Sequence, residues 1–353
     1  MSSIAFPRPL RAGDVVAVTA PSDGVERTLH PRLDLALGEL RASGFDVVEG
    51  ACLRGSVGEV SAPAASRASE LRKLWADGRV RAILPPWGGE LAIQTLPLLG
   101  PLFDELIATH GVSAAPWLMG YSDTSTLLFA ITVRTNVATA HGPALMELVP
   151  AQRDDVTQHW KSVLGAELGA TVMQSSSQRF QRDGADWVDD PAVAFALDQP
   201  TRWRGMRAGG AVPAMRIEGR LLGGCLDTIT NLVGTPFGDV EKFVARFPRE
   251  KLILYVENAG MTPAKFCRAL WHLRLAGWLD HASGLLVGRH APPDDPDFTF
   301  EAALKDVVGN LDLPVIFDAD IGHRPPQLTL VNGARAIVSL HAGGAATVAQ
   351  TFA

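Results

Sequence analysis

Short, almost continuous apolar runs recur along the chain, and each ends in glycine, proline or a polar residue. Runs of this length are typical of strands that are buried on both faces of a parallel sheet. The strands predicted in this way are Val15–Val18, Val80–Leu84, Trp117–Met119, Leu252–Val256, Leu285–Val287 and Pro314–Phe317. Because helical stretches separate them, the pattern indicates an α/β fold, in which ligands bind at the carboxyl ends of strands.

Three stretches between these strands carry helical signals. Apolar residues recur at helical spacing over Leu33–Ala42 and Ala64–Trp75. Thr262 followed by Pro263 is typical of an N-cap and a first helical residue, so a further helix is predicted from Pro263 to about Trp278.

The apolar pattern weakens between residues 166 and 215. We interpret 166–215 as a linker or loop-rich segment between an N-terminal domain over 1–165 and a C-terminal domain over 216–353. The stretches Arg335–Leu340 and Ala346–Gln350 predict a β-hairpin. The expected fold is therefore an N-terminal open, mostly parallel sheet with flanking helices, followed by a C-terminal α/β domain with a mixed sheet and a hairpin.

Composition narrows the function classes. The chain has 353 residues and a formal net charge of −6, which argues against a protein that neutralises the backbone of a nucleic-acid polymer. The three cysteines, Cys52, Cys225 and Cys267, are far apart, so no disulfide framework or zinc pattern is expected. With no bilayer-length apolar run and no apolar stretch of a secretory signal, we expect a cytoplasmic protein without membrane contact.

The sharpest chemical signal follows the strand predicted at Trp117–Met119. There the sequence continues as Gly120-Tyr121-Ser122-Asp123-Thr124 and then becomes helical. A strand, a Gly-x-Ser turn and a helix form the layout of a nucleophile elbow, although Thr124 stands where hydrolases carry a second glycine. The alternative is that Ser122 or Asp123 merely caps the helix.

A serine nucleophile needs a base, and His323 is the main candidate because it follows the last predicted parallel strand. His141 is the rival, with an ordinary turn histidine as its structural interpretation. Asp318, Asp320 and His323 also permit a metal cluster, but no second histidine lies at ligand spacing.

The acid candidate is Glu257, at the end of an otherwise apolar strand, where a carboxylate is costly to bury without a partner such as histidine. Its alternative role is that of a carboxylate at a helix entry. The order Ser122, Glu257, His323 is the nucleophile–acid–base order of hydrolases built on α/β sheets.

Trp87-Gly88-Gly89 follows the strand predicted at Val80–Leu84. A glycine pair lets backbone N–H groups approach a ligand closely, so this turn is a candidate second oxyanion donor beside the amide of Asp123. The alternative is an ordinary turn. The glycines do not form a dinucleotide-binding motif.

Taken together, these motifs resemble the LD-carboxypeptidase and microcin C immunity family of serine peptidases. The resemblance covers nearly the whole chain. The matching segments are Leu10–Val18, Ala20-Pro21-Ser22, Trp87-Gly88-Gly89, Gly120–Asp123, His141-Gly142-Pro143, Gly219–Leu226, Gly234-Thr235, Glu257 and Gly322-His323.

The resemblance implies a catalytic triad of Ser122, Glu257 and His323, with an oxyanion hole from the amides of Asp123 and Gly89. It also implies two α/β domains, a homodimer, and no metal or cofactor. Family members hydrolyse an amide near the C-terminal end of a small peptide: some trim muropeptide tetrapeptides, and others cut a peptide–nucleotide amide and confer resistance to microcin C.

Two features bear on substrate choice. Cys225 stands where the family pattern leads us to expect asparagine, which puts substrate contacts in doubt. The extra length around Trp203 favours the microcin immunity branch, whose aromatic loop covers the nucleotide. Trp203 and Arg204, together with Trp87 and Gly88, are therefore candidate substrate contacts; the alternative is that Trp203 is a packing residue.

Three hypotheses follow. The first is a serine amidohydrolase of the microcin immunity type, with a muropeptide LD-carboxypeptidase as the alternative. The second is a two-domain binding protein that keeps the cleft without turnover. The third is a metallohydrolase at Asp318, Asp320 and His323.

Overall fold

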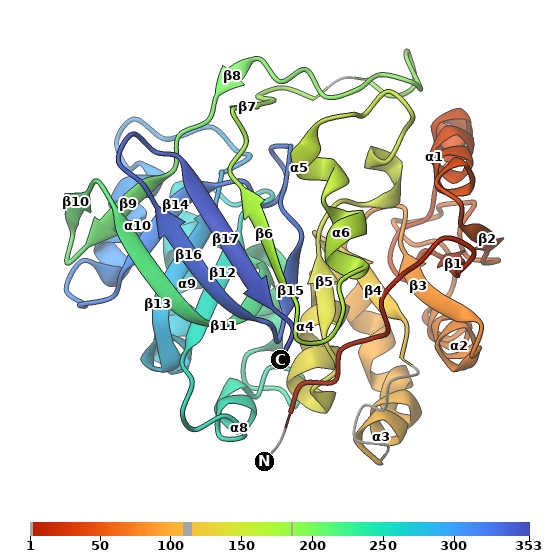
Figure 1. Ribbon diagram of the computed structural model, residues 1–353, viewed down its shortest axis with the longest axis horizontal. Helices are drawn as coiled ribbons and strands as arrows, with labels where there is room; N and C mark the ends of the chain where they lie inside the picture. The colour runs from red at the N-terminus through yellow and green to blue at the C-terminus, as the bar shows by residue number, and fades with distance from the viewer. Residues whose placement is uncertain (1–2, 109–114, 185) are drawn as a thin grey trace.

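The computed structural model describes residues 3–108, 115–184 and 186–353 and builds them around two large sheets (Figure 1). The first sheet has the strand order β15-β5-β4-β3-β1-β2. Its strands are β1 Val15–Val18, β2 Asp46–Glu49, β3 Val80–Leu84, β4 Trp117–Gly120, β5 Thr139–His141 and β15 Leu330–Asn332. β1 to β5 pair in parallel, which confirms the open, mostly parallel sheet expected for the N-terminal half.

The second sheet is mixed, with the strand order β10-β9-β14-β13-β12-β11-β16-β17-β6. Its strands are β6 Thr171–Ser175, β9 Arg204–Arg207, β10 Gly210–Val212, β11 Met215–Cys225, β12 Leu252–Glu257, β13 Ala282–Gly288, β14 Val315–Ala319, β16 Arg335–Leu340 and β17 Ala346–Thr351. β11 to β14 are parallel, and β16 with β17 forms the predicted hairpin.

One strand crosses between the two halves of the chain. β15 comes from the C-terminal part of the sequence but pairs antiparallel with β5 in the first sheet, with Leu330 opposite His141. The loop between β14 and β15 carries His323, so this pairing fixes that loop against the N-terminal half.

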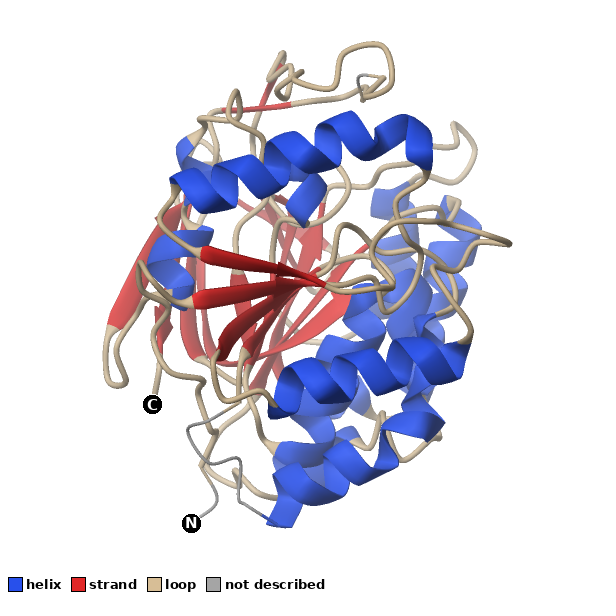
Figure 2. Cartoon of the chain, turned by 90° about the vertical axis from the view of Figure 1, so that its right-hand side faces the viewer, coloured by secondary structure: helices blue, strands red, loops and turns tan. Residues whose placement is uncertain are grey.

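Helices lie on either side of the strands of the first sheet (Figure 2). The α-helices are α1 His30–Ala42, α2 Ala64–Ala76, α3 Gly100–Ala108, α4 Thr124–Thr135, α5 Asp155–Gln158, α6 Trp160–Leu164, α7 Leu226–Ile229, α8 Val240–Val244, α9 Pro263–Leu275 and α10 Phe300–Val308. The 3-10 helices are η1 Arg27–Leu29, η2 Ala92–Leu99, η3 Leu145–Glu147, η4 Thr230–Leu232 and η5 Trp278–His281. Within the described ranges, no helix has the length and apolar character needed to cross a bilayer.

Two helices bear directly on the site. Every residue of α4 except Arg134 is buried, so the helix that follows Ser122 is held on all sides by the core. α9 begins as predicted, because the Thr262 side chain accepts a hydrogen bond from the Lys265 N–H and Pro263 takes the first position. It ends at Leu275 rather than near Trp278, because Gly277 adopts a left-handed conformation with φ of 78°.

The segment 166–215 is rich in loops, as the sequence predicts, but it is more than a linker. It contributes β6, β9 and β10 to the second sheet, and a separate two-stranded ribbon of β7 Arg179–Phe180 and β8 Gln199–Pro200. The ribbon and its connection run across the top of Figure 1 toward α1. β6 and β10 lie at the two edges of the sheet; β6 alternates exposed with covered residues and β10 is largely exposed, which explains their weak apolar pattern.

Candidate active site

Ser122 lies in the tight turn between β4 and α4, as the sequence predicts. Its φ of 58° is left-handed, a conformation that costs a non-glycine residue about 1–3 kcal/mol and that persists where surrounding structure enforces it. The turn is closed by the N–H of Ser125, which donates to the carbonyl of Ser122 at 2.9 Å. The first turn of α4 therefore begins directly behind the hydroxyl.

Three candidate residues from distant parts of the sequence meet at this hydroxyl. Nε2 of His323 lies 3.1 Å from Oγ of Ser122, and Nδ1 of His323 lies 2.8 Å from Oε2 of Glu257. Glu257 ends β12, and His323 follows β14, so the carboxyl ends of two parallel strands on either side of β13 position the acid and base candidates. Gly322 has a φ of 90°, and a Cβ there would collide with the Glu257 carboxylate, so glycine permits this close approach.

The electrostatics couple the acid and the base. Burial raises the pKa of Glu257, but the neighbouring His323 and His141 lower it, and the net result is a pKa below its ordinary value. Burial lowers the pKa of His323, whereas the charge and hydrogen bond of Glu257 raise it, and the net result is a pKa above the ordinary value of 6.5. The arrangement favours an ionised carboxylate that holds one imidazole tautomer and stabilises the imidazolium.

His141 is a buried neighbour of the acid rather than a turn histidine. Its Nε2 lies 3.9 Å from Oε1 of Glu257, the oxygen that His323 does not use, and both side chains are fully buried. The rings of Tyr121 and Tyr255 contact His141 edge-on. His141 thus belongs to the surroundings of Glu257, while His323 alone contacts the Ser122 hydroxyl among the described histidines.

The Gly88-Gly89 turn lies against the serine. A Cβ on Gly88 would come within 2.8 Å of Ser122 Oγ and 2.7 Å of the Asp123 amide nitrogen. Gly89 has a φ of 135°, and a Cβ there would lie 2.6 Å from Ser22 Oγ. Both positions require glycine, which leaves backbone groups next to the hydroxyl.

Asp123 has a structural role for its side chain in addition to its amide. Its buried carboxylate accepts hydrogen bonds from Ser22 Oγ at 2.5 Å and from the Ala92 N–H at 2.7 Å. It thereby holds two N-terminal loops around the elbow. Trp87 is partly buried against the core, and its carbonyl accepts from Thr124 Oγ1 at 3.4 Å.

Cys225 ends β11 opposite Glu257 in the strand register. It is fully buried, and burial followed by the nearby Glu257 and Asp227 charges raises the pKa of its thiol well above the ordinary value. The thiol is therefore neutral and packs beside the acid instead of acting as a nucleophile.

Trp203 is a core residue, which favours the alternative interpretation of it as a packing residue over that of a substrate contact. Its side chain is 1% exposed, and its Nε1 donates to Asp320 Oδ2 at 2.8 Å. The physical reason is that the chain around it pairs into the second sheet instead of forming a loop. Arg204 is exposed and binds Asp318 and Glu301.

Asp318 and Asp320, the carboxylates of the metallohydrolase hypothesis, form ion pairs with arginines of the protein. Asp318 accepts from Arg204 at 2.5 Å, and buried Asp320 accepts from Arg289 at 2.6 Å. Across the described ranges, no three His, Cys, Asp or Glu side chains are grouped to hold a metal ion. The residues present do not favour the metallohydrolase hypothesis.

Sequence reasoning missed Tyr121 and Glu147. Tyr121 donates its hydroxyl to Glu147 Oε1 at 3.0 Å, and its ring centroid lies 4.9 Å from that of His323. Tyr121 sits inside the Gly-x-Ser motif, so its place beside the serine was readable from the sequence. Glu147 carried no such signal because it lies in a separate 3-10 helix, η3.

Comparisons with known proteins agree with this architecture. The chain matches the model of the LD-carboxypeptidase N-terminal domain over residues 16–142 and that of the LD-carboxypeptidase C-terminal domain over residues 218–338. A Bacillus subtilis protein named "Probable murein peptide carboxypeptidase" is 27% identical over 94% of this chain and 91% of its own. The microcin C7 self-immunity protein MccF of Escherichia coli is 24% identical over 93% of this chain and 91% of its own.

Solved structures show the same fold. A structure of MccF covers 98% of each chain with a TM-score of 0.79 at 22% identity. The muramoyltetrapeptide carboxypeptidase of Oxalobacter formigenes covers 96% of this chain and 98% of its own, with a TM-score of 0.70 at 19% identity. With both halves of the family model matched in order, the chain belongs to the LD-carboxypeptidase family and is an enzyme of the serine carboxypeptidase type.

Proposed function

We propose that this protein hydrolyses an amide at the C-terminal end of a small peptide or peptidyl-nucleotide conjugate, with Ser122, His323 and Glu257 as its catalytic triad. The observation that carries the proposal is the unbroken hydrogen-bonded chain from the Ser122 hydroxyl through the imidazole to a buried carboxylate. Such a chain activates a hydroxyl that is otherwise a weak nucleophile.

In the acylation step, Ser122 Oγ attacks the amide carbonyl carbon while His323 Nε2 accepts the hydroxyl proton. The imidazolium then donates that proton to the departing amine, the C–N bond breaks, and an ester to Ser122 remains. Glu257 keeps the Nδ1 proton in place and stabilises the imidazolium without itself being protonated. Water next attacks the ester, with His323 again taking the proton, and the serine is released.

Backbone N–H groups bind the negative oxygen of each tetrahedral intermediate. We assign this role to Asp123 and Gly89, because the first turn of α4 presents amides and a positive dipole end beside Ser122. The contact of Gly88 with Ser122 Oγ and the Asp123 amide supports the pairing of these two segments.

We favour the peptidyl-nucleotide substrate. MccF, whose structure matches with a TM-score of 0.79, has been solved with aspartyl sulfamoyl adenosine and with glutamyl sulfamoyl guanosine. The muropeptide alternative is favoured by the 27% identity to the Bacillus subtilis protein. Turnover of an aspartyl-nucleotide conjugate and of a muropeptide tetrapeptide, measured side by side, decides between them.

The triad is tested with Ser122→Ala. We expect kcat to fall by up to about 10⁶-fold with little change in stability, because the residue lies on the surface of the site and loses one hydroxyl. Ser125→Ala is the matched control, since that serine binds the Cys225 amide and lies outside the triad. Retention of more than about a tenth of wild-type kcat by Ser122→Ala contradicts the assignment.

A binding protein without turnover is the remaining alternative. It predicts that an active-site serine reagent forms no adduct with the wild-type protein, whereas a working triad predicts a covalent adduct on Ser122. Mass spectrometry of the labelled protein, with Ser122→Ala as the unlabelled control, separates the two.

We also propose, from the family resemblance, that the protein is a cytoplasmic homodimer. The three cysteines are free and buried, as suits a reducing compartment. Sedimentation equilibrium of the purified protein tests the dimer.

A further inference from the structure

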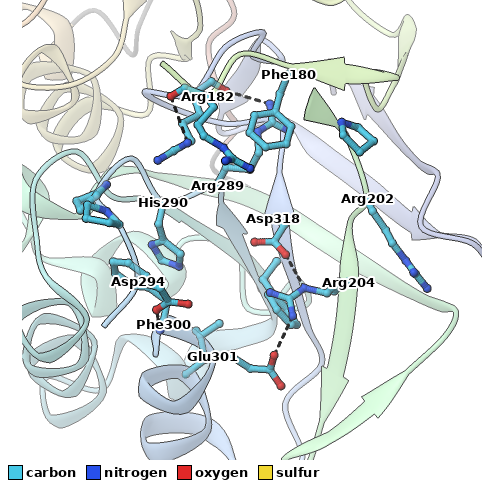
Figure 3. A pocket seen from close by; sticks show the side chains of 16 residues that line it. Phe180, Arg182, Arg202, Arg204, Arg289, His290, Asp294, Phe300, Glu301 and Asp318 are labelled. Atoms are coloured by element: carbon cyan, nitrogen blue, oxygen red, sulfur yellow. Dashed lines mark hydrogen bonds and ion pairs between the residues drawn. The ribbon is translucent and has the colours of Figure 1, made fainter. Parts of the chain in front are cut away.

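A cavity of about 430 Å³ opens at the carboxyl ends of β13 and β14 (Figure 3). Four parts of the chain line it: the β7–β8 ribbon with the residues after it, the loop after β13, the first half of α10, and the end of β14 with the loop that follows. Five arginines reach it, and these are Arg182, Arg202, Arg204, Arg289 and Arg324. The carboxylates in its lining are Asp294, Glu301 and Asp318.

Two of the arginines are neutralised by the protein. Arg204 lies between Asp318 and Glu301, with nitrogen–oxygen distances of 2.5 and 2.8 Å (Figure 3). Arg289 is buried and pairs with Asp320 at 2.6 Å behind the cavity. Arg289 and Asp320 cancel each other, whereas Arg204 is outnumbered by its two carboxylates.

The other three arginines have no carboxylate partner at hydrogen-bonding distance among the described residues. Arg202 is exposed and makes no hydrogen bond or ion pair there. Arg182 donates only to the amide oxygen of Gln199 at 3.0 Å. Arg324 donates to the carbonyls of Arg182 and Ala291, and its Nε is buried without a partner. The cavity therefore has five arginines against the four carboxylates of Asp294, Glu301, Asp318 and, behind it, Asp320, and three of the guanidinium groups are not paired with any of them, in a chain whose net charge is −6.

Burial lowers the pKa of Arg324; the charge of Asp183 opposes this, and the charges of Arg182 and Arg289 add smaller contributions that lower it further. Part of the lowering is therefore repulsion from the neighbouring arginines. His290, stacked on Phe300 at 3.7 Å, adds no charge, because burial holds its pKa at about 3. An anion in the cavity relieves the repulsion among the arginines.

The cavity is joined to the proposed catalytic residues through the backbone. Arg324 directly follows His323, and the Ala291 N–H donates to the carbonyl of Asn258, the residue after Glu257, at 3.3 Å. Asn258 also contacts His290 through its side-chain amide at 3.3 Å. The cavity and the Ser122 site therefore share the backbone segments that follow β12 and β14.

We propose that this arginine cavity binds a phosphate or carboxylate group carried by the substrate, with Arg182, Arg202 and Arg324 as its anchors. The proposal rests on the proposed amidohydrolase function and adds a chemical requirement: the substrate carries an anionic group away from the scissile amide. Guanidinium groups suit both anions because they donate paired N–H groups to two oxygens.

Direct binding tests the cavity without turnover. Calorimetric titration compares AMP with adenosine for the phosphate, and a muropeptide tetrapeptide with a form amidated at its carboxyl groups other than the C-terminal one for the carboxylate, using the Ser122→Ala protein. The double variant Arg182→Gln/Arg202→Gln removes two anchors that are exposed and so spares the fold. Arg72→Gln, on exposed α2, is the matched control.

We expect the anionic member of at least one pair to bind at least about 10-fold more tightly than its neutral counterpart, and the double variant to weaken that anion by about 10- to 100-fold. The neutral ligand and the Arg72→Gln control keep their affinities, and added salt weakens the anion. The pair that shows the difference identifies phosphate or carboxylate as the group.

Three results overturn the proposal: equal affinity for charged and neutral members of both pairs, unchanged affinity of the anion in the double variant, or no saturable anion binding at millimolar concentration. Loss of hydrolysis in Ser122→Ala is a separate readout. If the anion binds but the wild-type protein forms no serine adduct, the proposed amidohydrolase function is contradicted, whereas anion binding by the cavity is supported.

Discussion

The indole Nε1 of Trp203 donates a 2.8 Å hydrogen bond to Oδ2 of Asp320, and both side chains are buried. Asp320 also accepts from the Ser177 N–H at 2.9 Å and from Arg289 Nη1 at 2.6 Å. This carboxylate thus ties the segment before β9 to the loop that carries His323.

From this relationship we expect Trp203 to control stability and not substrate choice. Trp203→Phe removes a donor to a buried carboxylate and should cost about 1–3 kcal/mol of unfolding free energy. Trp203→Ala also leaves a cavity and should cost about 3–5 kcal/mol. Equilibrium urea unfolding measures both.

Trp187→Phe is the control, because that indole is partly exposed and stacks under Arg32. A shift of more than tenfold in the ratio of kcat/KM between substrates, at unchanged stability, contradicts the expectation.

The pH dependence of kcat/KM should follow His323. The base acts in its neutral form, and the pKa of His323 lies above 6.5, so kcat/KM rises with pH through a midpoint above that value. Glu257→Gln removes the largest influence that raises this pKa. The midpoint should move to lower pH, and kcat should fall by about 10⁴-fold, as when the acid of a comparable triad is replaced by its amide. A midpoint that does not move excludes Glu257 as the partner of the base.

His141 should contribute to stability at acid pH. The pKa of Glu257 is lowered in the folded state, so its contribution is present above the ordinary pKa near 4.5 and is lost as pH falls through the folded value. His141→Phe keeps an aromatic ring but removes the nitrogen beside Oε1, so the pKa of Glu257 rises and acid unfolding begins at higher pH. A rise of one pH unit in this pKa corresponds to about 1.4 kcal/mol. Circular dichroism during acid titration reads the midpoint; an unchanged midpoint shows that His141 does not act on Glu257.

The Gly88 turn should be intolerant of a single methyl group. Gly88→Ala places a Cβ against Ser122 and the Asp123 amide, so we expect kcat to fall by about 10²-fold or more through displacement of the oxyanion donors. Gly78→Ala is the control, because the same methyl there meets nothing within 4 Å. Steady-state kinetics with a melting curve for each variant checks the result. Near-normal kcat in a folded Gly88→Ala protein rules out this turn as part of the oxyanion hole.

Local sequence patterns were sufficient to predict the strands of the parallel sheet and the turn that carries Ser122. β1 and β3 have the bounds expected from their apolar runs, and β4 runs from Trp117 as predicted, because strands buried on both faces must be apolar throughout. The elbow at Ser122 was readable for the same reason, since strand, turn and helix are consecutive. The order of Ser122, Glu257 and His323 also follows from the sequence, because each follows an apolar strand of a parallel sheet.

Tertiary structure decided what depends on distant partners. The edge strands β6 and β10 face solvent on one side and leave little apolar signal, so only their pairing with β17 and β9 defines them. Trp203 is buried because Asp320, 117 residues later, supplies its hydrogen-bond acceptor. The contact of His141 with Glu257 and the convergence of the arginines at the ends of β13 and β14 likewise join residues far apart in the chain. Burial and electrostatic pairing depend on which distant residues the fold brings into contact, and a local pattern of residues does not encode those contacts.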